Sequence, residues 1–199
     1  MRLYGDLKSG NCYKVALLLG QLGAAYEFVP IDIMKGETRK PEFMSINPNG
    51  KIPLLEISPG QFLPESNAIL WYLAEDTAFL PGDRFQRAQV LQWLFFEQYS
   101  HEPYVATARF IKLYLGNPPE RQAELQQKIQ RGYGALDVME KHLAANKFFV
   151  GGRYGIADIG LFAYTHVAHQ GGFDLAPYPH LNSWLVRVKG QPKYRPMPA

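Results

Sequence analysis

The spacing of apolar positions changes part-way along the chain, and this change predicts two kinds of structure. Over residues 1 to about 75, short β-rich runs alternate with stretches in which apolar side chains recur every three or four residues. The order is βαβ, a loop with a short helix, then ββα, which predicts a small mixed sheet with helices on its faces. The predicted strands are Arg2–Tyr4, Tyr26–Ile31, Leu54–Ile57 and Gln61–Leu63, and the predicted helices are the one closed by Gly23 and Glu65–Ala74.

Strand patterns disappear after the Pro81-Gly82 pair, and only helical spacing follows. Gln86–Leu115 is predicted as one long helix bent at Pro103. A second helix follows the Gly116–Pro119 stop, and Ile156–His169 and Tyr178–Lys189 supply two more. The predicted fold class is therefore α/β plus all-α, with a mixed domain over 1–76, a linker over 77–86 and a helical bundle domain over 87–199.

Composition narrows the functional classes. Hydrophobic residues make up 47% of the chain and charged residues 20%, which is typical of a globular protein. The net charge is +3, but the densest basic cluster, Lys35–Lys40, also contains Glu37, so we expect anionic small molecules rather than nucleic acid as partners. No apolar run approaches the roughly 18 residues of a membrane span, and the first residues lack the apolar region of a secretory signal. With Cys12 as the single cysteine, we expect a cytoplasmic protein without intrachain disulfides or membrane contact.

Three motifs are candidates for chemistry, and the first is the turn from the first strand into the first helix. A helix N-terminus presents unpaired N–H groups and the positive end of a dipole, which stabilise an anion. A hydroxyl there can donate a hydrogen bond to the same anion. Ser9 therefore suits stabilisation of a thiolate better than nucleophilic attack, for which no histidine base follows within the first domain. The alternative is that Ser9 or Asn11 simply caps the helix.

The second motif is Asn47–Leu55, which resembles a phosphate loop only superficially because Ser45 stands where the first glycine would be. Pro53 opens a strand after a turn, so it is a candidate cis proline or a plain strand-initiating proline. A cis bond would turn the preceding backbone groups toward an extended ligand.

The third motif is Glu65-Ser66 at a predicted helix start. This pair can bind the ammonium and carboxylate of an α-amino acid, or can be an ordinary helix start.

Together these motifs resemble the cytosolic glutathione S-transferase family, and the resemblance extends over essentially the whole chain. Its parts are Ser9 with Asn11 and Lys14-Val15, Asn47-Pro48-x-Gly50-Lys51-Ile52-Pro53, Glu65-Ser66-Asn67-Ala68-Ile69, Gly151-Gly152-x-x-x-Ile156-Ala157-Asp158, Pro179-x-Leu181-x-x-Trp184 and Gln191-Pro192. The chain departs from the family at Gly155, where a capping serine or threonine is usual. Glycine is a tolerable cap at a few tenths of a kcal/mol.

The resemblance implies a thioredoxin-like first domain that binds glutathione as co-substrate and a helical domain that binds a hydrophobic electrophilic small molecule. Ser9, with Asn11, would stabilise the glutathione thiolate. Tyr104 and Phe110 would line the acceptor pocket. The other residues implied to bind glutathione are Ile52 and Pro53 for the cysteinyl unit, Glu65 and Ser66 for the γ-glutamyl group, and Lys51 with Thr38 or Arg39 for the glycyl carboxylate. The family is usually dimeric, so a homodimer is expected, with no metal ion.

Two alternatives remain open from the sequence. Ser9 suggests theta- or zeta-like transfer chemistry, whereas Asn11 and the segment 36–51 resemble the bacterial nu class, whose members reduce disulfides with glutathione. The same thiolate would serve a transferase and a disulfide or peroxide reductase. A protein-interaction module of the same fold is a different class of function, although such a module has no need to keep Ser9 or the Glu65-Ser66 pair.

Overall fold

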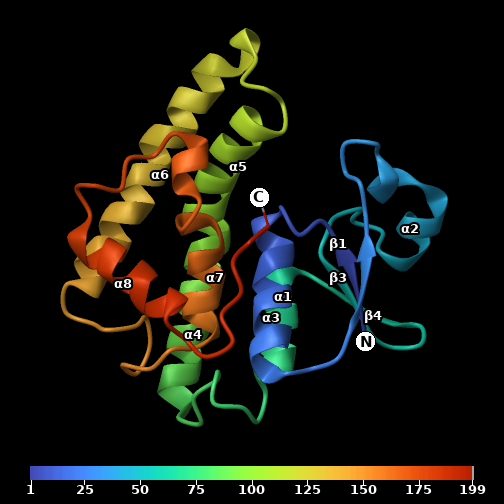
Figure 1. Cartoon of the computed structure of the whole chain (residues 1–199), viewed down its shortest axis with the longest axis horizontal. Coiled ribbons are helices and arrows are strands. Elements are labelled where there is room, and N and C mark those ends of the chain that lie inside the picture. Colours follow the sequence, from blue (N-terminus) through green and yellow to red (C-terminus); the bar gives the residue numbers. More distant parts are fainter. Residues whose placement is uncertain (199) are drawn as a thin grey trace. The chain divides into compact units, whose positions relative to one another are not determined.

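The computed structural model describes residues 1–198, which form two compact units. The first unit comprises Met1–Thr77 together with the tail from Pro192, and the second comprises Ala78–Gln191. Each unit has its own secondary structure and core, and Figure 1 shows their elements in the colours of the sequence. None of the helices among the described residues is long and apolar enough to span a bilayer.

The first unit is built on a four-stranded sheet of order β2–β1–β3–β4. Strand β1 pairs in parallel with β2 and antiparallel with β3, which pairs antiparallel with β4. The mixed sheet predicted from the sequence is therefore confirmed. The elements of this unit are β1 (Arg2–Gly5), α1 (Gly10–Leu22), β2 (Glu27–Pro30), the 3-10 turn η1 (Glu37–Arg39), α2 (Pro41–Ile46), β3 (Leu54–Ser58), β4 (Gln61–Pro64) and α3 (Ser66–Ala74).

Alternation along β1 and β3 divides the core of this unit between the two faces of the sheet. Leu3 lies opposite Leu55 in the register, and both pack with side chains of α1 and α3. Tyr4 lies opposite Leu54, and both pack with Phe43 of α2. Because successive strand residues point to opposite faces, α1 and α3 cover one face and α2 the other. Figure 1 shows this arrangement, with α1 and α3 side by side.

The C-terminal tail belongs to the first unit, which differs from the expected division at 87–199. The Tyr13 hydroxyl on α1 donates to the Arg195 carbonyl at 2.7 Å, and Gln21 Nε2 approaches the Pro192 carbonyl at 3.4 Å. These side chains of α1 hold the tail against the helix. The contacts join residues more than 170 positions apart, so local sequence patterns cannot predict them.

The second unit is helical throughout its described elements. They are α4 (Arg84–Phe96), the π-helical turn η2 (Glu97–His101), α5 (Glu102–Leu113), η3 (Pro119–Arg121), α6 (Gln122–Leu143), α7 (Ile156–Thr165), η4 (Ala168–Gly171) and α8 (Pro179–Lys189). Helix α4 begins inside the segment expected as a linker, because the Asp83 side chain accepts a hydrogen bond from Gln86 N at 2.9 Å and caps the helix.

The long helix predicted over 86–115 is interrupted by η2 rather than simply bent at Pro103. Proline has no N–H to give to the carbonyl four residues earlier, so the preceding turn must rearrange. A π turn does this by widening the helix over Glu97–His101. Glu97 and His101 are fully buried there, and His101 Nε2 lies 2.9 Å from the Thr165 hydroxyl of α7.

Helix α7 is the buried centre of this unit, and Asp158 fixes its start. The Asp158 carboxylate accepts hydrogen bonds from Phe149 N at 3.2 Å, Trp184 Nε1 at 2.8 Å and Gly155 N at 3.1 Å. Burial raises the pKa of Asp158 to about 7, and these donors oppose the rise. Asp158 therefore joins α7, α8 and the preceding loop.

Gly155 is required for a reason that the sequence does not show. A Cβ at this position would lie 2.7 Å from the Phe79 carbonyl oxygen, which also accepts the hydrogen bond of Ile156 N at 3.1 Å. We therefore expect Gly155→Ser to lower stability by about 1–3 kcal/mol, because the steric overlap outweighs the few tenths that a serine cap contributes. Thermal unfolding of the variant tests this, with Gly134→Ala as a helix-surface control that meets no neighbour. A higher melting temperature for Gly155→Ser would contradict the expectation.

Candidate functional site

Ser9 lies directly before α1, where the backbone is extended (φ −76°, ψ 126°). Its carbonyl accepts the hydrogen bond of Tyr13 N at 2.9 Å, so Ser9 occupies the N-cap position. Its side chain makes no hydrogen bond to the helix backbone, however, so the alternative that the Ser9 hydroxyl caps α1 is wrong. The half-buried hydroxyl lies next to the positive end of the α1 dipole, where an anion is stabilised.

Cys12 follows in the first turn of α1 and is fully buried. Burial raises the pKa of its thiol to about 12, although hydrogen bonds from the Asp6 backbone and the Ser9 side chain act in the opposite direction. The sulfur packs against β1, where a Cβ on Gly5 would lie 2.6 Å from it. Cys12 is therefore a neutral packing residue, and its own thiol is no candidate for thiolate chemistry.

The loop before β3 has the conformation that the second motif predicts. The Ile52–Pro53 peptide bond is cis, so Pro53 is the cis proline rather than a plain strand-initiating one. Asn47 is buried and holds the loop from inside, because its Nδ2 donates to the Lys51 carbonyl at 2.7 Å and its Oδ1 accepts from Asn49 N at 3.2 Å. Ile52 is half-buried, and its pairing with a cysteinyl unit stays a prediction.

Glu65 and Ser66 lie at the turn from β4 into α3. Glu65 is exposed and has φ 69° and ψ 111°, a conformation that non-glycine residues rarely adopt and that costs about 1–3 kcal/mol. Such strain concentrates at functional sites, which supports a ligand-binding role for Glu65. Its carboxylate lies 3.5 Å from Asn49 Nδ2, so this turn reaches the cis-proline loop.

Ser66 connects the same turn to α1. Its hydroxyl is buried and lies 3.3 Å from Asn11 Oδ1, and Lys14 Nζ lies 2.7 Å from the same oxygen and 3.4 Å from Ser66 Oγ. The three predicted motifs are thus linked by side-chain contacts into one region of the first unit. Lys14 was assigned no role from the sequence, although a lysine on the helical stripe otherwise occupied by Leu17, Leu18 and Gln21 is a detectable signal.

The residues implied to bind a glycyl carboxylate lie around the turn that contains Gly50. Arg39 is exposed, with Nη1 3.4 Å from the Asn49 carbonyl. Gly50 has φ 60°, and a Cβ there would lie 3.0 Å from the Thr38 carbonyl oxygen, so this turn favours glycine. Lys51 is exposed, whereas Thr38 is buried, which favours Lys51 and Arg39 over Thr38 as contacts for a ligand in solution.

Tyr104 and Phe110, the predicted acceptor-pocket residues, both lie on α5 of the second unit. The Tyr104 ring is half-buried, with Lys128 Nζ 5.6 Å and the Arg131 guanidinium 5.8 Å from its centroid. Phe110 stacks on Tyr114 at a centroid distance of 5.2 Å. The structure brings neither residue into contact with the other, and their role at an acceptor pocket stays a prediction.

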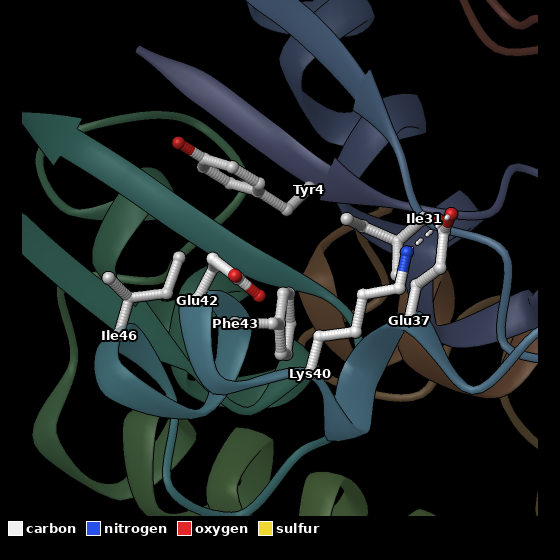
Figure 2. A pocket seen from close by; sticks show the side chains of 7 residues that line it. All are labelled: Tyr4, Ile31, Glu37, Lys40, Glu42, Phe43 and Ile46. Carbon is white, nitrogen blue, oxygen red and sulfur yellow. Dashed lines mark ion pairs between the residues drawn. The ribbon is translucent and has the colours of Figure 1, made fainter.

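The first unit also contains a hollow of about 440 Å³ on the α2 face of the sheet (Figure 2). Tyr4, Phe43 and Ile46 form apolar parts of its wall, and the Lys40 ammonium lies 3.5 Å from the Glu37 carboxylate at its rim. Its lining residues include none of those predicted to bind glutathione. The hollow is therefore separate from the region of Ser9 and Ser66.

Among residues 1–198, no group of three or more histidine, cysteine or acidic side chains is placed to hold a metal ion. His166 stacks on Phe162 at 4.4 Å, and its Nδ1 lies 2.9 Å from the Phe162 carbonyl. Burial lowers the pKa of His166 to about 4, so the ring is neutral near pH 7. His169 is exposed.

Comparison with known proteins agrees with this geometry. The family model for the glutathione S-transferase N-terminal domain matches residues 1–75, and the model for the C-terminal domain matches residues 93–192. The chain belongs to the glutathione S-transferase family. The thioredoxin-like first unit and the helical second unit are the two domains of that family, so the fold class expected from the sequence is confirmed.

Three similar proteins show the range of the family. A crystal structure of a glutathione S-transferase from Pseudomonas fluorescens is 55% identical, with a TM-score of 0.97 and coverage of 98% of both chains. The disulfide-bond oxidoreductase YfcG of Escherichia coli is 33% identical over 92% of this chain and 87% of its own. A glutathione transferase from Pseudomonas putida, solved with one glutathione disulfide bound per subunit, is 29% identical, with a TM-score of 0.82 over 96% of this chain and 87% of that one.

Proposed function

We propose that this transferase binds glutathione along the first unit and stabilises its thiolate for attack on an electrophilic small molecule. The observation that carries the proposal is the linkage of the three motifs, through the Asn11–Ser66 contact at 3.3 Å and the Asn49–Glu65 contact at 3.5 Å. This linkage brings a thiolate-stabilising helix end close to a pair suited to an α-amino acid. Glutathione carries both groups in one molecule.

The chemistry follows from the charges. The Glu65 carboxylate takes the γ-glutamyl ammonium, while the Ser66 hydroxyl and the backbone N–H groups at the start of α3 take its carboxylate. The thiol then lies near Ser9 and the start of α1. Lowering a thiol pKa by roughly two units requires about 2.7 kcal/mol. A hydrogen bond to an anion contributes about 1.5–3 kcal/mol and a helix dipole about 0.3–1 kcal/mol, so Ser9 and α1 are sufficient without a metal ion.

In the transfer step, the thiolate sulfur forms a bond to the electrophilic carbon and the leaving group departs with its bonding electrons. The thiol proton is released to solvent before attack. An assay with glutathione and chlorodinitrobenzene tests the proposal, because thioether formation and chloride release are measured together. Saturable turnover of both would support transfer, whereas a rate equal to that of glutathione alone in solution would count against it.

Reduction of disulfides with glutathione is the second candidate, favoured by the 33% identity to a named disulfide-bond oxidoreductase and by the disulfide-bound relative. In this reaction one glutathione thiolate attacks the disulfide and releases a thiol. A second glutathione then resolves the mixed disulfide to glutathione disulfide. Because Cys12 is buried and protonated, we expect Cys12→Ala to leave this activity unchanged. An assay with hydroxyethyl disulfide separates this reaction from transfer.

We infer that the enzyme works as a homodimer through an apolar stripe on α4 and the following turn η2. Phe85, Leu91, Phe95 and Tyr99 are exposed, and the last three follow one another at intervals of four residues. The exposed fractions of Phe95 and Tyr99 are 63% and 80%, which is unusual for aromatic side chains so close together. A second copy of the chain would cover this stripe.

The single buried cysteine also fits a reducing cytoplasmic setting, in which glutathione is available.

Phe95→Glu is expected to weaken this dimer by at least tenfold, because burying an unpaired carboxylate in an apolar contact is costly. Sedimentation of the wild type and the variant over a range of concentrations gives the dissociation constants. Val186→Glu is the matched control, since Val186 is 70% exposed and belongs to a different helix, α8. A dimer unaffected by Phe95→Glu would place the interface elsewhere.

A further inference from the structure

Lys14 is the most unusual charged residue of the first unit, because its side chain is fully buried. It lies on the inner face of α1, next to the core residues Cys12, Val15 and Leu18. Lysine is almost never fully buried unless polar groups receive its N–H donors. Here the ammonium lies 2.7 Å from Asn11 Oδ1 and 3.4 Å from Ser66 Oγ, inside the region that we propose for glutathione.

The contacts around Lys14 determine how Asn11 is oriented. An ammonium can only donate hydrogen bonds, so the Asn11 atom at 2.7 Å must be the carbonyl oxygen and not the amide nitrogen. The Ser66 hydroxyl lies 3.3 Å from the same oxygen and donates to it. With Oδ1 engaged by two donors, the Asn11 NH₂ group is directed away from Lys14. The donors of Asn11 therefore lie on the side of the amide opposite its oxygen, and donors suit an anion such as a thiolate.

Lys14 also orients the hydroxyl of Ser66. Its oxygen accepts from Lys14 Nζ, and it has one hydrogen to donate. Without ligand that hydrogen points to Asn11 Oδ1, and it can turn to a carboxylate while Lys14 continues to occupy both Asn11 Oδ1 and Ser66 Oγ. The positive charge of Lys14 also attracts an anion at this place.

We propose that Lys14 is a positioning residue of the glutathione site, which holds Asn11 as a donor to the thiolate and Ser66 as a donor to the γ-glutamyl carboxylate. This inference rests on the proposed function. One buried ammonium would thus align the donors to both the cysteinyl thiolate and the γ-glutamyl carboxylate of bound glutathione. Lys14 itself needs no contact with glutathione, because it acts through Asn11 and Ser66.

The test is Lys14→Met in the full-length protein. Methionine is a long, unbranched apolar side chain, so the substitution removes the charge and the hydrogen-bond donors but retains most of the packing. We expect the melting temperature to be unchanged or higher, since a buried charge is replaced by an apolar group. The KM for glutathione should rise at least tenfold. The pKa of the bound glutathione thiol, measured from thiolate absorbance across pH, should also rise. Lys35→Met removes the same charge from an exposed side chain and is the matched control, expected to change neither value.

A double-variant comparison shows whether Lys14 acts through Asn11. If it does, Asn11→Ala raises the pKa of the bound thiol, and adding Lys14→Met to Asn11→Ala raises it no further, while KM still increases through Ser66. Lys14→Gln keeps a neutral donor for Asn11 Oδ1. Compared with Lys14→Met, it should therefore bring the thiol pKa closer to the wild-type value than it brings the KM. It also serves as a second variant should Lys14→Met fold poorly.

The outcomes separate this inference from the proposed function. Wild-type protein that fails to bind glutathione contradicts the proposed function itself. Wild-type binding with Lys14→Met unchanged in both KM and thiol pKa overturns the role of Lys14 alone. An equal loss in Lys14→Met and Lys35→Met would overturn it as well, because the effect would then be one of overall charge.

Discussion

Ser9→Ala is expected to lower turnover roughly ten- to a hundredfold at saturating glutathione while binding of glutathione survives. The reason is that the Ser9 hydroxyl lies at the start of α1 and makes no hydrogen bond to the helix backbone, so it can turn from the Cys12 thiol to a bound thiolate. A hydrogen bond to an anion contributes about 1.5–3 kcal/mol, and this range corresponds to the expected loss. The thiolate exists only after the thiol ionises, so most of the effect should appear in kcat rather than in affinity.

Steady-state kinetics with chlorodinitrobenzene, combined with calorimetric affinity for glutathione, measures the two quantities separately. Ser9→Thr retains the hydroxyl and is the matched control, expected to keep most of the activity. Turnover that is unchanged in Ser9→Ala would shift thiolate stabilisation to Asn11 or to the backbone N–H groups of α1. A loss confined to glutathione affinity would also contradict the assigned role.

The largest loss of stability is expected from Asp158→Ala, at about 3–5 kcal/mol. This change removes the acceptor of three N–H donors, of which those of Phe149 and Trp184 are buried at distances of 3.2 and 2.8 Å. Each buried donor left without a partner costs about 1–3 kcal/mol. For a chain of this size the melting temperature should fall by roughly 10 °C or more. The activity of the folded fraction should change little, because the hydrogen-bond partners of Asp158 are Phe149, Gly155 and Trp184, none of which is a candidate site residue.

Asp158→Asn is the control for this prediction, because its carbonyl oxygen can still accept from Phe149 N and Trp184 Nε1. The pH dependence gives a second check. The pKa of Asp158 is about 7 in the folded protein and near 4 when unfolded, so the contribution of this group to stability falls as pH rises between those values. The stability of the wild type relative to Asp158→Asn should therefore be greater at pH 5 than at pH 8. The reverse order would contradict a buried carboxyl with a raised pKa.

Local sequence patterns predicted the first unit well because its elements are short and strongly periodic. Leu3 and Tyr4 are adjacent in β1 and point to different cores, as alternation requires. Gly23 ends α1 in the left-handed region with φ 70°, as the sequence suggested. The cis-proline loop was also predictable, since its residues are contiguous from Asn47 to Pro53.

Three features were missed, one because the helix responds to a proline differently than expected and two because they depend on distant contacts. The π turn at Glu97–His101 replaces a simple bend, because the helix absorbs the missing N–H of Pro103 several residues earlier. The tail joins the first unit through hydrogen bonds to side chains of Tyr13 and Gln21, which no local pattern reveals. Gly155 was predicted only as a weak cap, and its true constraint is the Phe79 carbonyl.

The sequence identified the separate motifs of the site, but it could not show which of their side chains contact one another. Ser66 and Asn11 are 55 positions apart, and only the packing of α3 beside α1 brings their side chains to 3.3 Å. Lys14 had a visible signal, a charge on an apolar helical stripe. Its meaning depends on the two oxygens that it contacts, and these come from its own helix and from α3.

The central claim is that the first unit binds reduced glutathione through Glu65, Ser66 and the start of α1. Calorimetric titration of the purified protein with glutathione, and then with glutathione disulfide, tests it most directly, with Glu65→Ala as the variant that removes the ammonium contact. The account predicts saturable binding of glutathione to the wild type, with affinity reduced at least tenfold in the variant. Tighter binding of the disulfide would favour the reductase within the same site. Absence of binding by either compound would contradict the account and direct attention to a protein partner.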